Sequence, residues 1–72
     1  MEIQAVVGKN VRRYRELKGI SQEELGAQSN LHRTYVSGVE RGIRNPTVEI
    51  IKKLADALGV EPNELLEAPI GR

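Results

Sequence analysis

Several residue types that build common functional sites are absent or scarce in this 72-residue chain. It contains no cysteine, tryptophan or phenylalanine, and it has only one methionine, one histidine and two tyrosines. Without cysteine there is no disulfide framework, thiolate zinc site or cysteine nucleophile. The single histidine has no evident acid or nucleophile beside it in the sequence, which argues against a catalytic site. We therefore expect neither an enzyme nor a metal or other cofactor.

Long hydrophobic runs are also absent. No apolar segment approaches the roughly 20 residues that a membrane span requires, and no charged-then-apolar leader opens the chain. We therefore expect a cytoplasmic protein without membrane contact. With 39% apolar and 29% charged residues, the composition is typical of one small globular domain. A single core of this size provides little stability, so we expect self-association or close helix packing to contribute.

The formal net charge of +1 hides an uneven distribution along the chain. Residues 9–44 carry eight basic and four acidic side chains, whereas residues 45–72 carry three basic and five acidic ones. A basic first part followed by an acidic second part indicates a polyanionic partner on one side of the molecule only.

Apolar spacing predicts an all-α fold of five short helices, because strand-like alternation is absent. The predicted helices cover residues 3–18, a two-turn segment after Ser21, residues 32–41, residues 48–58 and a short segment from Pro62. We expect the domain to span residues 1–67, followed by a flexible tail over residues 68–72.

Local signals define where these helices begin and end. Gly19 and Gly59 follow helical segments, where glycine commonly supplies a left-handed stop. Ser21 and Glu24 have the spacing of a capping box. Thr47 follows Pro46 and is expected to cap the fourth helix.

Residues 21–42 form the arrangement of a helix-turn-helix motif, with two short helices separated by a tight turn. Leu25 and Val36 are expected to fill the space between the crossing helices. Gly26 indicates a point of close helix approach, since glycine is otherwise unfavourable in a helix. Leu31 is expected to insert from the turn into the core.

The outward face of the third helix carries residue types that read bases in the major groove. Arginine can donate two hydrogen bonds to guanine, and threonine or serine can reach base edges. Glycine would let the helix lie deep against the bases. The predicted base-reading residues are Arg33, Thr34, Ser37 and Gly38. His32, at the start of this helix, is interpreted as a cap or surface residue.

A second set of residues is expected to bind DNA phosphates and so to set affinity and register. Gln22 lies at a helix N-terminus, which favours an anion, and other candidates follow the reading helix. The predicted phosphate-binding residues are Gln22, Tyr35, Arg41, Arg44 and Asn45. Tyr35 could instead serve mainly in packing.

The second part of the chain has more apolar residues than one small core needs. Ile50, Leu54, Leu65 and Leu66 are therefore predicted to form a two-fold dimer interface. An alternative remains open for Leu54 and Leu65, which could equally complete the core of the monomer.

Taken together, segments 15–25, 36–42 and 46–47 resemble the Cro/repressor-type (xenobiotic-response-element) helix-turn-helix family, over about residues 7–66. Within this match, residues 29–41 are similar to the controller proteins of restriction-modification systems. The resemblance implies a lambda-repressor-like all-α domain with the base and phosphate contacts given above. It also implies an ion pair between Arg15 and Glu40, and a homodimer on a near-palindromic site. His32 and Gly42 depart from the controller pattern, so the operator sequence cannot be carried over.

The leading hypothesis is a sequence-specific DNA-binding transcriptional regulator that acts as a dimer, with a restriction-modification controller as its specific form. Its dimer would block RNA polymerase or contact it, and no small-molecule effector is expected. The alternative is an antitoxin-like protein whose main partner is another protein. Such proteins usually carry an additional tail, and little sequence follows residue 66 here.

Overall fold

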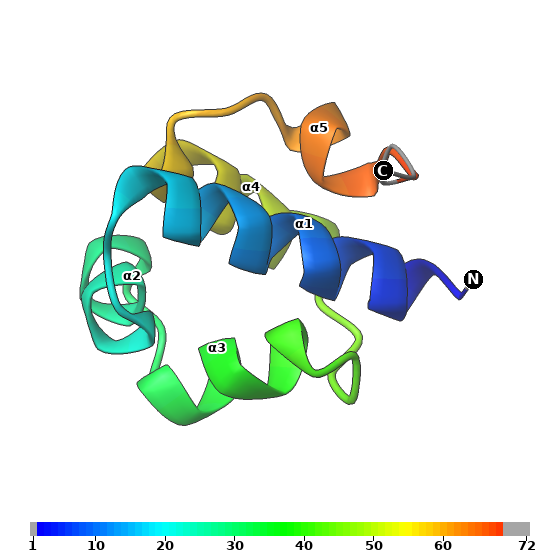
Figure 1. The fold of residues 1–72 in the computed structure, drawn as a ribbon. Coiled ribbons are helices and arrows are strands. Elements are labelled where there is room, and N and C mark those ends of the chain that lie inside the picture. Colours follow the sequence, from blue (N-terminus) through cyan, green and yellow to red (C-terminus); the bar gives the residue numbers. More distant parts are fainter. Residues whose placement is uncertain (1, 69–72) are drawn as a thin grey trace.

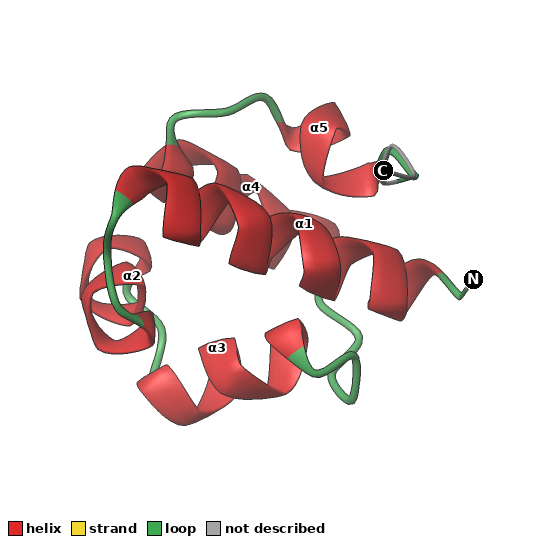
Figure 2. Cartoon of the chain, viewed as in Figure 1, coloured by secondary structure: helices red, strands yellow, loops and turns green. Residues whose placement is uncertain are grey.

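The computed structural model describes residues 2–68, and within that range it contains five α-helices and no strand (Figures 1 and 2). They are α1 (Ile3–Lys18), α2 (Gln22–Ser29), α3 (Arg33–Glu40), α4 (Val48–Leu58) and α5 (Pro62–Leu66). The predicted all-α fold is confirmed. Of the tail predicted over residues 68–72, residues 69–72 lie outside the described part of the chain.

The helix boundaries follow from side chains near them in the sequence. The Ser21 hydroxyl accepts a hydrogen bond from the backbone N–H of Glu24 at 3.0 Å, and the Glu24 carboxylate accepts one from the Ser21 N–H at 2.8 Å. This is the predicted capping box. Similarly, the Thr47 hydroxyl accepts from the Ile50 N–H at 3.2 Å. The ring Nδ1 of His32 accepts from the Thr34 N–H at 3.0 Å, so His32 caps α3.

α1 is the helix around which the others are arranged, and it contacts α3, α4 and α5. In Figure 1, α3 and α5 lie on opposite sides of α1. α2 and α3 pack against each other through Leu25 and Val36, which are fully buried as predicted. The helix-turn-helix motif is therefore held through contacts of α3 with α1 and of α2 with α4.

The polar side chain of Asn10 attaches α5 to the other side of α1. Asn10 is buried, and its amide nitrogen donates to the carbonyl oxygens of Leu65 at 2.9 Å and Glu67 at 2.7 Å. Carbonyls at a helix C-terminus have no partner within the helix. The Asn10 amide supplies that partner from a position 55 residues away in sequence.

The structure corrects the predicted dimer interface at two positions. Leu54 and Leu65 have no exposed surface and belong to the core, so they cannot contact a second copy of the folded chain. Ile50 is partly buried against the same core, and Leu66 is 44% exposed. The alternative left open for Leu54 and Leu65 is thus the correct one.

None of the helices in the described part of the chain has the length and apolar character needed to cross a membrane.

Candidate nucleic-acid interface

α3 presents a polar face opposite its buried one. Val36 and Val39 are fully buried, whereas Arg33 and Thr34 are exposed and Ser37 is partly exposed. The 3.6-residue helical period places these three polar side chains along one stripe. Together with Gln22 from the start of α2, they line an open hollow on the surface. The structure therefore brings three predicted base-reading residues and one predicted phosphate-binding residue together.

A mostly buried ion pair connects α1 with the end of α3. Arg15 Nε lies 2.6 Å from Glu40 Oε2, and a second guanidinium nitrogen lies 3.1 Å from Glu40 Oε1. The two side chains are only 13% and 3% exposed. Hydrogen bonding to Glu40 raises the pKa of Arg15, so the guanidinium stays charged. The ion pair implied by the family resemblance is present, and it joins α1 to the end of α3.

Gln22 belongs to the same network. Its amide nitrogen donates to Glu40 Oε1 at 3.0 Å. An amide nitrogen carries two hydrogens, so this contact orients Gln22 without using all its donors. The structure thus explains how Gln22 is held beside α3, and its role as a phosphate ligand stays a prediction.

Arg44 lies back along α3. After α3 ends, Gly42 adopts a left-handed backbone with φ of 75°, and the Ile43 N–H donates to the Gly38 carbonyl at 3.0 Å. This turn reverses the chain. The Arg44 guanidinium carbon then lies 5.7 Å from the centre of the Tyr35 ring, within the range of a cation–π contact.

This arrangement gives Gly38 a neighbour that the sequence does not predict. Gly38 is buried, and its expected role in letting the helix lie deep against the bases stays a prediction. A Cβ atom added there would lie 2.7 Å from Arg44 Cγ. Arg44 therefore covers Gly38 in the free protein, and the absence of a side chain makes room for Arg44. Tyr35 has a packing role through the same contact.

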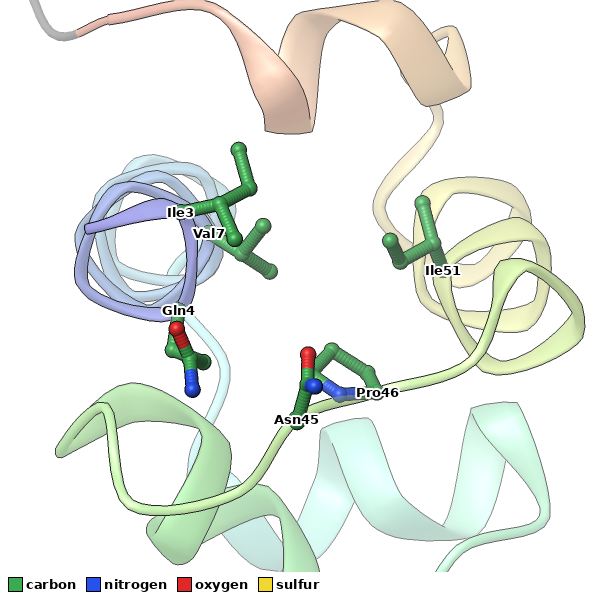
Figure 3. A pocket seen from close by; sticks show the side chains of 6 residues that line it. All are labelled: Ile3, Gln4, Val7, Asn45, Pro46 and Ile51. Carbon is green, nitrogen blue, oxygen red and sulfur yellow. The ribbon is translucent and has the colours of Figure 1, made fainter.

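The remaining predicted phosphate-binding residues occupy the segment between α3 and α4. Arg41 is exposed at the C-terminus of α3. Asn45 is exposed too, but it lines a different pocket, between the start of α1 and α4 (Figure 3). The other residues around that pocket are Ile3, Gln4, Val7, Pro46 and Ile51. Asn45 is thus separate from the hollow that contains Gln22 and Arg33.

Gly8 is a contact between α1 and α3 that sequence reasoning missed. A Cβ atom at Gly8 would lie 2.8 Å from the carbonyl oxygen of Glu40, and still closer to that of Val39. Gly8 therefore lets α1 approach the end of α3. The signal available in the sequence was a glycine inside an otherwise regular helix, the same signal that correctly marked Gly26.

Charged residues are unevenly distributed over the helices. Arg33, Arg41 and Arg44 are exposed on or beside α3. The acidic residues of the second part of the chain lie on α4, α5 and their flanks, where α4 also carries the exposed Lys52 and Lys53; they are Glu49, Asp56, Glu61, Glu64 and Glu67. Within residues 2–68, no three His, Cys, Asp or Glu side chains are grouped so that they could hold a metal ion. The arrangement favours one polyanion on the α3 side.

Comparison with known proteins agrees with this geometry. The sequence model of the family described as Helix-turn-helix matches residues 11–65. The control protein C.BamHI of Bacillus amyloliquefaciens is 46% identical over 66 residues, which cover 90% of this chain and 82% of that protein.

Two solved structures are similar over most of the chain. The hypothetical transcription factor NHTF from Neisseria matches with a TM-score of 0.91 and 48% identity, covering 94% of this chain and 78% of that one. The restriction-modification controller protein C.AhdI from Aeromonas hydrophila matches with a TM-score of 0.83 and 50% identity, covering 86% and 90%.

Proposed function

Because this chain belongs to the helix-turn-helix family of DNA-binding transcriptional regulators, we propose that it regulates transcription as a homodimer bound to a near-palindromic operator. The observation that carries this proposal is the polar stripe of α3, with Gln22 beside it. A stripe of this kind on a short exposed helix suits the major groove, which is about 12 Å wide and admits one α-helix.

In the proposed complex, α3 enters the major groove and its exposed side chains read the bases. Arg33 donates two hydrogen bonds to a guanine, and Thr34 and Ser37 contact neighbouring base edges. Gln22, Arg41 and Arg44 bind phosphates on either side of the groove. Contacts of this second kind set affinity and register but carry no sequence information directly.

We propose a homodimer because one short reading helix contacts only one half-site of an operator. Two copies of α3 would enter successive major grooves roughly 34 Å apart, so operator symmetry mirrors that of the protein. Ile50 and Leu66 supply the apolar contact between copies, since both retain surface in the folded monomer. The acidic side chains of α4 and α5 keep the opposite side away from DNA.

The specific role that we propose is control of a restriction-modification locus. A relative that is 46% identical is named a control protein, and a structural neighbour at 50% identity is a restriction-modification controller. The dimer would act at its own promoter and at that of a neighbouring gene, either blocking RNA polymerase or contacting it.

Selection from a randomised duplex pool at fixed salt tests DNA binding. The Arg33→Ala variant should bind the preferred sequence about 1–3 kcal/mol less tightly and lose preference at one position. Lys53→Ala is the matched control, since it removes the same charge from an exposed position on α4. If the wild-type protein retains no duplex even at low salt, the proposed function is wrong.

A further inference from the structure

Within residues 2–68, three glycines lie inside helices, and their surroundings differ. A Cβ atom at Gly8 would meet the Glu40 carbonyl oxygen at 2.8 Å, and one at Gly26 would meet the Leu31 carbonyl oxygen at 2.6 Å. Both atoms belong to the backbone, which cannot move without disturbing helix packing. At these two positions, glycine is a requirement of the fold.

Gly38 differs because an added Cβ atom would meet side-chain atoms rather than backbone. The three nearest atoms to an added Cβ are Arg44 Cγ at 2.7 Å, Nε at 3.3 Å and Cδ at 3.6 Å. Alanine is a better helix former than glycine, so folding alone would favour alanine at position 38. The nearest atoms that glycine accommodates here all belong to the side chain of Arg44.

Arg44 is held at this place from two directions. Its stem lies on Gly38, and its guanidinium group lies over the ring of Tyr35, 5.7 Å from the centre. Residues 35 and 38 are three apart and so share one side of α3. That side borders the stripe of Arg33, Thr34 and Ser37, and Arg44 itself is exposed. Its charge is therefore both oriented and accessible at the edge of the reading face.

We propose that Gly38 is a positioning residue for DNA binding, which acts by giving Arg44 a fixed place along α3 beside the reading face. This inference rests on the proposed function, in which Arg44 binds a phosphate. Ordering a long side chain before binding lowers the entropy lost on association. With alanine at position 38, the Cβ atom would require the Arg44 side chain to leave its place along α3.

A double-mutant cycle separates this role from a direct one. Affinity for one operator duplex is measured for the wild type, Gly38→Ala, Arg44→Ala and the double variant. Gly38→Ala should weaken binding about two- to tenfold when Arg44 is present, and leave affinity unchanged in the Arg44→Ala background. Equal losses in both backgrounds would mean that Gly38 acts by close approach of the helix to DNA, and would overturn the proposal. So would unchanged affinity in the Gly38→Ala single variant.

A second measurement needs no DNA. In the proton NMR spectrum of the wild type, the ring of Tyr35 should shift the side-chain resonances of Arg44 upfield, and Gly38→Ala should abolish this shift. A shift that persists in Gly38→Ala would overturn the positioning role. If the wild type binds no duplex, the proposed function fails, and this spectrum still decides whether Gly38 positions Arg44.

Thermal unfolding provides the folding control. Gly38→Ala should melt at or above the wild-type temperature, because Arg44 can move and the helix gains a better helix former. Gly26→Ala should melt lower, since its Cβ meets backbone. A Gly38→Ala variant that melts well below the wild type would show that Gly38 is needed for packing, against the proposal.

Discussion

At the scale of single residues, the Glu40 carboxylate accepts hydrogen bonds from side chains of two other helices. Its two oxygens accept three hydrogen bonds, two from Arg15 and one from Gln22. Arg15 also donates to the carbonyl oxygen of Ile20, just before α2. The carboxylate therefore connects α1, the start of α2 and the end of α3.

Removing the charge of Glu40 should destabilise the fold. In Glu40→Gln, Arg15 keeps its charge at a mostly buried position without an ionic partner. We expect a loss of about 3 kcal/mol in the free energy of unfolding, the lower end for a broken buried pair, because Arg15 retains some exposure to solvent. Urea unfolding followed by circular dichroism measures this loss.

An exposed ion pair on α1 supplies the control. Glu16→Gln breaks the ion pair between Arg12 and Glu16, whose side chains are 65% and 56% exposed. This change should alter the free energy of unfolding by less than about 0.5 kcal/mol. Replacing both buried partners, in Arg15→Met with Glu40→Leu, should recover most of the loss. Equal stability of Glu40→Gln and the wild type would contradict the structural role of this pair.

At the scale of elements, the helices were predictable from sequence because the signals for their ends are local. Ser21 and Thr47 cap helices with partners three residues away. The third helix was predicted over residues 32–41, and the structure has Arg33–Glu40 with both predicted end residues as caps. Cap residues provide hydrogen-bond partners for backbone groups at a helix end. The predicted and observed bounds of α3 therefore differ by one residue at each end, but they describe the same helix.

Contacts between distant parts of the chain could not be predicted in the same way. The amide of Asn10 binds carbonyls 55 and 57 residues later, and no local pattern contains that information. Periodicity showed that Leu54 and Leu65 are apolar positions, but not whether the core or a partner covers them. For the site, helical periodicity was enough to predict the exposed stripe of α3. The contact between Arg44 and Gly38 depends on the turn at Gly42, which brings residues six apart together.

Asn10 therefore provides a prediction about α5. Asn10→Ala removes the donor for the carbonyls of Leu65 and Glu67, and should reduce stability by about 1–3 kcal/mol. Hydrogen exchange should accelerate first in the amides of α5. The matched control is Asn63→Ala, whose amide contacts Glu67 only at the exposed surface. Unchanged exchange in α5 of Asn10→Ala would show that apolar packing alone holds this helix.

At the scale of the whole molecule, the domain measures 29 × 22 × 18 Å, and the proposed DNA contact uses one helix, α3. An operator with two half-sites thus needs two copies. Two adjacent leucines near the end of α5 differ in burial, because Leu65 is fully buried while Leu66 is 44% exposed. Of the two, only Leu66 is therefore available for the proposed dimer contact.

Substitutions at these two leucines should give different defects. Leu66→Glu should leave the monomer folded and weaken the proposed dimer about tenfold or more, as expected for loss of a central apolar contact. Sedimentation velocity over a range of concentrations measures this. Leu65→Ala should instead reduce the stability of the monomer by about 2–5 kcal/mol.

Leu17→Glu controls for the added charge, because Leu17 is 72% exposed on α1 and has no predicted role in the interface. A Leu66→Glu protein that dimerises like the wild type would place the interface elsewhere.

The contact between Gly38 and Arg44 also has a consequence for the engineering of this domain. Stabilisation by exchanging helical glycine for alanine is a common strategy, and Gly38 invites it because an added Cβ atom would meet a side chain rather than backbone. The resulting variant should keep its melting temperature, yet bind its operator with lower affinity. Screening for thermostability alone would thus select a weaker regulator.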